Sequence, residues 1–170
     1  MARRAIIVDT GPLLTYLAVE YVRERKLTEA SDRMLLRDIR SGMPFGESEQ
    51  EVLRDRFRQD APAATTHVVV EALRFREHSE LAKRAEDFRG FCIGLIAKGA
   101  VSEVCCTTSE IEAGEGTRQL ARRHGITDAG LVFVAMRRSA VLVTDDRRLR
   151  GALPSGGPFE IKTLDEYLRA

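Results

Sequence analysis

This sequence of 170 residues lacks the features on which several classes of protein depend. Its three cysteines, Cys92, Cys105 and Cys106, form neither a disulfide framework nor a Cys-x-x-Cys metal pair, so we expect small core residues in a reducing compartment. The longest apolar run, 129–136, is far shorter than the roughly 18 residues of a membrane-spanning helix. The apolar stretch before Asp9 is too short for a secretory signal peptide. We therefore expect a cytoplasmic protein with no membrane partner.

An excess of charge of one sign is also absent, because 27 basic residues nearly balance 26 acidic ones. The net charge of +1 excludes a histone-like, polybasic mode of binding by the whole chain. The sequence has no tryptophan and only 6% aromatic residues, which leaves little platform for stacking nucleic-acid bases. Local positive charge lies in residues 118–150, where eight arginines outnumber three aspartates. The scarcity of aromatic residues disfavours a protein that recognises nucleic-acid bases by stacking.

Short apolar runs, rich in β-branched residues, alternate along the chain with patterns of helical spacing. Residues 27–60 predict two polar helices around a turn at 41–44, as an insertion within a single domain over 1–170. Strands separated by helices predict an α/β fold of three layers, α/β/α, around a central parallel sheet of four to five short strands. The expected strands are 5–8, 64–66, 100–107, 141–143 and, at an edge, 159–162. The expected helices are 12–26, one from about 66, 79–98, 109–124, 128–138 and one from 163.

Helix starts are predicted from capping boxes, in which Ser or Thr is followed three residues later by Glu. We also expect Thr127 to cap a helix that begins at Asp128, and residues 151–158 to form a loop rich in Gly and Pro. The predicted capping boxes are Ser48 with Glu51, Ser109 with Glu112, and Thr163 with Glu166.

Five acidic residues, spread over 138 positions, lie at corresponding ends of the expected elements. Asp9 follows the first strand, and Asp145 and Asp146 follow the fourth. Asp128 opens the helix before that fourth strand, and Glu71 lies about one turn into an earlier helix. The carboxyl ends of parallel strands and the amino ends of their crossover helices share one edge of the sheet, the usual ligand edge. We therefore expect these carboxylates to converge there.

Each acid also has an ordinary structural interpretation: Asp9 as a helix cap, Asp128 as a first-turn acid, Glu71 as a solvated charge, and Asp145 with Asp146 as a turn. Their common placement favours a functional cluster instead. Carboxylates brought together repel one another and take up protons unless a cation neutralises them. Oxygen ligands suit Mg²⁺ or Mn²⁺ rather than zinc, and such ions activate water for attack on a phosphodiester.

Polar residues beside the acids are candidates to bind substrate. Thr144 can orient a carboxylate or a metal-bound water, or simply end the strand, and Thr10 can hold the turn after the first acid. Arg147 and Arg148, with Arg150, directly follow the last acid and are candidates to hold the phosphates of a substrate. The histidines have no ligand spacing, and we expect them at the surface or hydrogen-bonded in the core: His67, His78 and His124.

Several segments, in this order, resemble the PIN-domain ribonucleases, a family that includes the toxin halves of VapBC toxin–antitoxin pairs. The resemblance covers nearly the whole chain and implies Mg²⁺-dependent cleavage of single-stranded RNA. The matching segments are Ile6-Ile7-Val8-Asp9-Thr10-Gly11-Pro12-Leu13-Leu14, His67-Val68-Val69-Val70-Glu71-Ala72-Leu73, Thr127-Asp128-Ala129 with Ala135, Val141-Leu142-Val143-Thr144-Asp145-Asp146, and Ile161-Lys162-Thr163-Leu164-Asp165-Glu166.

The resemblance also implies roles and partners. Its acidic set is Asp9, Glu71, Asp128 and Asp146, with the three aspartates as metal ligands. The family's last element reads Thr-x-Asp, which favours Asp146, although Asp145 could substitute for it. Implied partners are an RNA substrate, a small antitoxin protein and a second copy of the chain. The 27–60 insertion and the long stretch between Glu71 and Asp128 depart from the compact toxins.

Other classes of function remain as alternatives. The same fold could be a catalytically inactive module that binds nucleic acid or protein. A phosphohydrolase of the haloacid-dehalogenase type would need an Asp two residues after Asp9, where the chain has Gly11. A receiver-like domain would need a lysine after a late strand, and none is well placed.

Overall fold

The computed structural model describes residues 4–26, 35–37, 46–74, 84–153 and 157–170. Five strands, all parallel, form one sheet in the order β3-β2-β1-β4-β5. The predicted three-layer α/β/α fold with a parallel sheet is therefore confirmed. The three middle strands are buried along their whole length, which explains their uniformly apolar or small side chains. The strands are β1 (Ile6–Val8), β2 (Ala63–Thr65), β3 (Ser102–Val104), β4 (Val141–Val143) and β5 (Glu160–Lys162).

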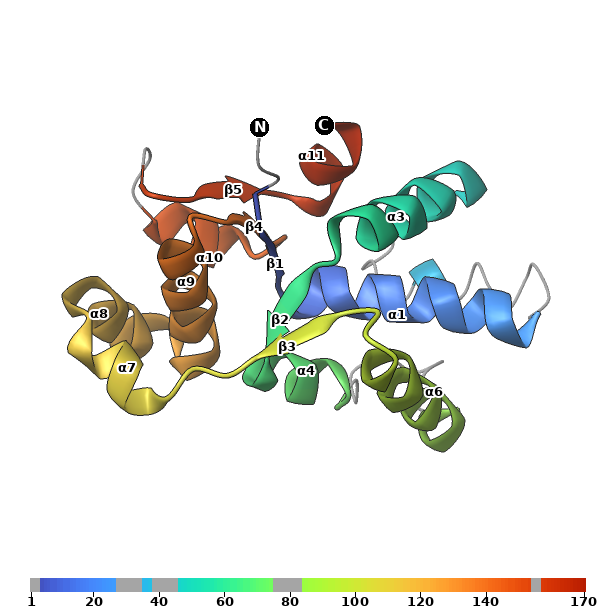
Figure 1. The fold of residues 1–170 in the computed structure, drawn as a ribbon, viewed down its shortest axis with the longest axis horizontal. Helices are drawn as coiled ribbons and strands as arrows, with labels where there is room; N and C mark the ends of the chain where they lie inside the picture. The colour runs from blue at the N-terminus through green and yellow to red at the C-terminus, as the bar shows by residue number, and fades with distance from the viewer. Residues whose placement is uncertain (1–3, 27–34, 38–45, 75–83, 154–156) are drawn as a thin grey trace.

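Helices cover both faces of the sheet. Helices α1, α3 and α6 gather on one side of the strands, and α7, α8 and α9 on the other (Figure 1). Helix α9 packs directly on β1, β2 and β4, while α8 packs on α9. The helices are α1 (Thr10–Arg25), α3 (Glu47–Asp60), α4 (Thr66–Ala72), α6 (Ala85–Ala97), α7 (Thr108–Ala113), α8 (Glu115–His124), α9 (Ile126–Arg138), α10 (Arg147–Ala152) and α11 (Leu164–Arg169).

The strand order reverses its direction between β1 and β4. After β1 the chain crosses to β2 and β3 on one side, and it then returns past β1 to β4 and β5 on the other. Right-handed crossovers in opposite directions place their helices on opposite faces, and the point where the direction changes is the usual ligand position of an open α/β sheet. The register pairs Val8 with Val143, and the next residues, Asp9 and Thr144, therefore leave the sheet side by side.

Two of the three predicted capping boxes are wrong by two residues. Helix α7 is capped by Thr107, whose hydroxyl accepts from the Glu110 N–H while the Glu110 carboxylate accepts from the Thr107 N–H. Helix α3 starts after Gly46, and it is the Glu49 carboxylate that accepts from the Gly46 N–H. The third box is confirmed, with Thr163 and Glu166 capping α11.

The helix expected over 109–124 is two helices, because Gly114 has an extended conformation between α7 and α8. The Thr117 hydroxyl, which is buried, donates to the carbonyls of Ile111 and Gly114 at this break. Thr127 does not cap α9, which begins at Ile126 after Gly125 at φ +102°. Glycine adopts this left-handed conformation at little cost, so the backbone itself makes the turn.

Three further expectations need correction or fall outside the described residues. Gly151 is not in a loop, because it lies within α10. Cys92 and Cys106 are buried as expected, but Cys105 is exposed. The proposed turn at 41–44 lies outside the described residues. None of the described helices is long and apolar enough to cross a membrane.

Candidate active site

Asp9 lies at the carboxyl end of β1, at the point where the strand order reverses. Its backbone N–H donates to the Val143 carbonyl of β4, which extends the strand pairing by one residue. Its carboxylate accepts from the Thr10 N–H at 2.6 Å through Oδ1 and from the Thr144 hydroxyl at 2.6 Å through Oδ2. The residue is 9% exposed, so this carboxylate is held in one orientation within the protein.

Thr144 connects the acids of the two central strands. Its hydroxyl, which is fully buried, donates to Asp9 and accepts from the backbone N–H of Asp146 at 3.1 Å. One hydroxyl therefore fixes both the orientation of Asp9 and the turn that places Asp146. This is the carboxylate-orienting role considered for Thr144 from the sequence.

Asp146 is the N-cap of α10, and only one of its carboxylate oxygens accepts the capping hydrogen bonds. Oδ1 accepts from the N–H groups of Arg148 at 2.7 Å and Leu149 at 3.1 Å, which caps the helix. The negative charge of Asp146 raises the pKa of both Asp9 and Asp128. The capping bonds therefore hold Asp146 where its negative charge reaches the other acids.

Asp128, in the first turn of α9, has a strongly altered acidity. Burial raises the pKa of the Asp128 carboxyl from 3.8 to about 6, and the charges of Asp9 and Asp146 add to the rise. Glu71 contributes in the same direction, whereas His124 lowers this pKa. Like charges at short range disfavour ionisation. The three other predicted acids therefore all lie close enough to Asp128 to act on it.

Asp9 itself has a raised pKa, mainly because burial disfavours its charged form. Hydrogen bonds from Thr144 and Thr10 lower this pKa, while the charges of Glu71 and Asp146 raise it. Perturbed acids that act on one another at a topological switch point are typical of functional sites.

Glu71 lies near the end of α4, and its side chain is exposed. The Thr10 hydroxyl donates to its Oε2 at 3.1 Å. Thr10, at the start of α1, therefore contacts two of the acids, Asp9 through its N–H and Glu71 through its hydroxyl. The sequence predicted that Thr10 would hold the turn after Asp9, and the structure adds its link to Glu71.

Asp145 points to a different part of the molecule from Asp146. Its Oδ1 accepts from the Leu164 N–H at 2.9 Å, at the start of α11. Asp145 therefore joins β4 to the last helix. It is not among the groups that mainly shift the pKa of Asp9 or of Asp128. The structure groups Asp146, rather than Asp145, with the other three acids.

The arginines after Asp146 differ in their surroundings. Arg147 and Arg148 are exposed, and neither forms an ion pair within the described part of the chain. Arg150 is paired with Glu166 at 3.4 Å and is only half exposed. Arg147 and Arg148 are thus the two that remain available for a phosphate.

The donor chemistry of the acids suits a hard divalent cation, but their side chains are not arranged as a ligand shell. Within the described ranges, no group of three His, Cys, Asp or Glu side chains is gathered closely enough to hold a metal ion. Electrostatic interactions act over longer distances than the 2.0–2.6 Å of metal–oxygen bonds. The acids can therefore shift one another's pKa without being close enough to bind the same ion. Carboxylate oxygens and their negative charge suit Mg²⁺ or Mn²⁺. The positions of these side chains do not by themselves form a metal-binding site.

Two histidines differ from what the sequence predicted, and one of them, His124, acts on an acid of the site. His124 ends α8, and its charge lowers the pKa of Asp128 four residues later. The Nδ1 atoms of His67 and His124 are buried and have no hydrogen-bond partner among the described residues. The expectation of surface or hydrogen-bonded core histidines is wrong for these two atoms. The spacing of His124 and Asp128 across Gly125 was the available signal.

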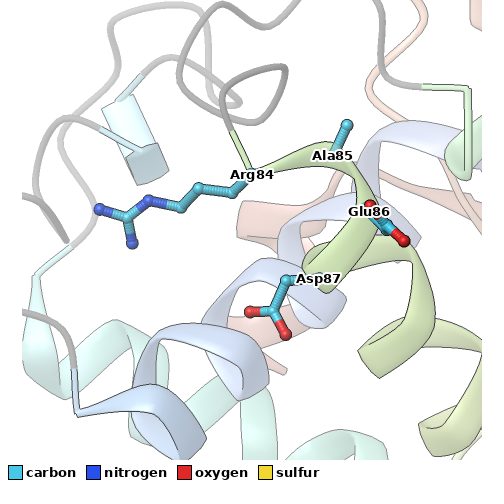
Figure 2. Close-up of a pocket in the computed structure, with 4 residues that line it drawn as sticks. All are labelled: Arg84, Ala85, Glu86 and Asp87. Atoms are coloured by element: carbon cyan, nitrogen blue, oxygen red, sulfur yellow. The ribbon is translucent and has the colours of Figure 1, made fainter.

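An open cavity of about 460 Å³ lies elsewhere, at the start of α6, and is lined by Arg84, Ala85, Glu86 and Asp87 (Figure 2). Asp87 is paired with Arg25 and accepts from the Tyr21 hydroxyl at 2.7 Å. These contacts tie α6 to α1, so the acids here have a structural role. None of the four predicted acids lines this cavity.

Comparison with known proteins gives no family assignment. No protein-family model matches the chain, and no curated protein matches it. The functional interpretation therefore depends on the geometry and electrostatics of the carboxylate group.

Proposed function

We propose that this protein is a Mg²⁺- or Mn²⁺-dependent endoribonuclease of the PIN-like type, which cleaves single-stranded RNA at the carboxyl edge of its sheet. The observation that carries the proposal is the convergence of four acids from separate elements. Hydrogen bonds of Thr144 join Asp9 to Asp146, those of Thr10 join Asp9 to Glu71, and the charges of Asp9, Asp146 and Glu71 raise the pKa of Asp128. Such repulsion costs stability, and a divalent cation between the carboxylates would offset it.

Asp9, Asp128 and Asp146 are the residues that would hold the metal ion, with Glu71 at the side of the site. A bound divalent ion would supply Lewis acidity and a water of lowered pKa for attack on a phosphodiester. The chain contributes orientation: Thr144 and Thr10 hold Asp9, and the α10 N–H groups hold Asp146. Each Asp9 oxygen already accepts one hydrogen bond, and Asp146 Oδ1 accepts two, so a metal ion would use the remaining lone pairs of these carboxylates.

The substrate class follows from the charge beside the acids. Arg147 and Arg148 lie directly after Asp146, are exposed and are unpaired in the described part of the chain. Guanidinium groups bind phosphate oxygens through paired hydrogen bonds. Because none of the described exposed large apolar side chains is aromatic, base stacking has little part in binding. The site therefore favours the backbone of an unpaired strand over particular bases.

The proposal includes two protein partners. A small antitoxin would cover the acidic edge, and a second copy of the chain would form a homodimer through the 27–60 region. Exposed Val52 on α3, within that region, is compatible with a further contact. Molecular mass in solution, with and without a co-expressed neighbouring small protein, measures both associations.

A second function has one observation in its favour. Since no three described donors are gathered into a ligand shell, the fold could instead be a catalytically inactive module that binds nucleic acid or protein. That alternative requires RNA binding that is unaffected by EDTA and no heat of Mg²⁺ or Mn²⁺ binding in calorimetry.

The deciding experiment is cleavage of a labelled single-stranded RNA by the purified protein, with Mn²⁺ and with EDTA. We expect cleavage with Mn²⁺ only, and a loss of at least about 100-fold in Asp9→Asn and Asp146→Asn, because electrostatic stabilisation at a metal is a large part of such rates. Circular dichroism should show that both variants remain folded.

Asp145→Asn is the matched control. It changes the same charge at the adjacent position, and an amide oxygen can still accept from the Leu164 N–H. We expect this variant to retain activity. Full activity of Asp9→Asn and Asp146→Asn, or equal cleavage in EDTA, would refute the proposal.

A further inference from the structure

Two pairs of adjacent arginines lie at ends of elements that adjoin the acids: one pair follows Asp146, and the other lies in the turn that ends just before α9. Arg147 and Arg148 begin α10, directly after Asp146. Arg122 and Arg123 lie in the last turn of α8, which joins α9 through the single residue Gly125. The α9 first turn carries Asp128. Positive charge therefore accompanies the acids both at the start of α10 and at the junction of α8 with α9.

The four arginines differ from many others on the surface. All four are exposed, and none forms an ion pair within the described residues. Elsewhere arginines do pair with acids. These pairs are Arg4 with Glu160, Arg25 with Asp87, Arg54 and Arg58 with Glu20, Arg137 with Glu110, and Arg150 with Glu166.

Unpaired cations beside a carboxylate group meet a physical requirement of the proposed reaction. A polyanionic strand is repelled by the acids, and positive side chains beside them, in addition to a bound divalent cation, would attract its phosphates. A strand held on one side only would extend away from the site. Cations on both sides hold the chain across it, so the phosphate over the acids has bound neighbours in both directions.

We propose that Arg122 and Arg123 form a second phosphate-binding surface, and that single-stranded RNA crosses the acids from the α10 arginines to the α8 arginines. This inference rests on the proposed function for its choice of ligand. It assigns binding on both sides of the scissile phosphate, which suits cleavage within a strand rather than removal of a terminal nucleotide. The contacts are to phosphates, so binding is indifferent to base sequence.

The chain offers a matched control for this surface. Arg137 and Arg138 are also an adjacent exposed pair in the last turn of a helix, but α9 runs back from the acids, so they lie at the opposite end from Asp128. Removing them changes the net charge by the same amount. Arg137 also loses its exposed pair with Glu110, which contributes little to stability.

The experiment measures binding of a fluorescent, unstructured oligouridine strand by anisotropy at several salt concentrations. All variants carry Asp9→Asn in the full chain, so the strand is not cut during the measurement. We expect Arg122→Ala/Arg123→Ala to weaken binding about tenfold or more and to reduce the slope of log K against log salt by about 1.4, at about 0.7 per released phosphate contact. Arg137→Ala/Arg138→Ala should leave the slope unchanged.

A second variant guards against a folding defect. Arg122→Lys/Arg123→Lys keeps both charges, so its salt slope should match the parent while its affinity falls less than that of the alanine pair. An unchanged slope in the alanine pair, or an equal fall in the Arg137/Arg138 control, overturns the second surface. Displacement of RNA by an equal charge concentration of polyglutamate would instead indicate an acidic protein segment as the occupant, and also overturns it.

Failure of the proposed function gives a different pattern. If the unmodified protein fails to cut RNA with Mn²⁺ while the Arg122/Arg123 variant still loses affinity and slope, the binding surface stands and the nuclease proposal fails. If cleavage occurs and the alanine pair binds normally, the nuclease stands and the second surface fails.

Discussion

At the scale of single residues, Thr144 connects the acid that follows β1 to the acid that follows β4. Its side chain is fully buried between a carboxylate that accepts from it and an N–H that donates to it. A hydroxyl can serve as donor and acceptor at once, whereas most side chains of this size cannot. The hydroxyl lowers the pKa of Asp9 and so opposes the effect of burial on that carboxyl.

Thr144→Val tests this connection, because valine has nearly the same shape and no hydroxyl. The substitution leaves the buried Asp9 carboxylate without one donor and the Asp146 N–H without its acceptor. We expect the free energy of unfolding at neutral pH to fall by about 2 kcal/mol, the cost of unsatisfied buried polar groups. Urea denaturation followed by circular dichroism measures it.

Thr144→Ser is the control, since serine retains both hydrogen bonds and removes only a methyl group. It should lose less stability than the valine variant. A valine variant as stable as the parent would show that the hydroxyl adds nothing to the fold, contrary to its place between two polar groups.

The adjacent acids after β4 show what residue-level sequence reasoning can and cannot reach. Placement of a strand before Asp145 and Asp146 was enough to predict an acid at the sheet edge. It did not reveal which one joins the group, because that depends on the path of the backbone after Thr144. The structure directs Asp145 to the Leu164 N–H and Asp146 to the start of α10, where the charge of Asp146 acts on the pKa of Asp9 and Asp128.

At the scale of elements, local patterns predicted the presence of helices better than their starts. Thr107-x-x-Glu110 and Ser109-x-x-Glu112 both satisfy the capping-box pattern, and the sequence offers no local reason to choose. The earlier box is used because the chain leaves β3 only three residues before α7, and Ile111 is then buried. Tertiary packing therefore selects between two locally equivalent caps.

The break between α7 and α8 depends on Gly114 for a steric reason. A Cβ at this position would lie 2.5 Å from Thr117 Oγ1, whose two hydrogen bonds fix the break. We expect Gly114→Ala to lower the free energy of unfolding by about 1–2 kcal/mol, since the alanine must displace a buried hydroxyl. Urea denaturation is again the measurement.

Gly116→Ala provides a comparison of opposite sign. Gly116 lies within the first turn of α8, and an added Cβ there meets no atom within 4 Å. Alanine restricts the unfolded chain and favours the helix, so this variant should gain about 0.5–1 kcal/mol. A loss of stability at Gly116, or none at Gly114, would contradict the steric account of the break.

At the scale of the whole molecule, the site is a consequence of topology. Alternating strands and helices predicted a parallel sheet and hence a common edge, but they did not predict the order β3-β2-β1-β4-β5. That order makes β1 and β4 neighbours, although 132 residues lie between Val8 at the end of β1 and Val141 at the start of β4. Long-range pairing of this kind leaves no local signal in a sequence, so the contact of Asp9 with Thr144 was not predictable.

The same topology makes the acids a source of instability without a cation. Between the unfolded value of 3.8 and about 6, the folded protein holds a proton on Asp128 that the unfolded chain has lost. Stability due to this group therefore falls as the pH rises through that range. Asp9, whose pKa is also raised, acts in the same direction.

We expect Asp128→Asn to remove this effect and to be more stable than the parent at pH 7.5 in EDTA. Asp128 is only half buried, so solvent screening limits the gain to about 1 kcal/mol, and the difference should vanish near pH 4. Thermal unfolding of both proteins across pH 4–7.5 measures it, and titrating groups that do not interact with Asp128 cancel in the comparison. Mg²⁺ at ten times its Kd should stabilise the parent by about 1.4 kcal/mol at pH 7.5, and much less at pH 4.5 where protons compete. Asp145→Asn, outside the group, should keep the full Mg²⁺ response. An Asp128→Asn variant that responds to Mg²⁺ as the parent does would show that these carboxylates are not where a divalent cation acts.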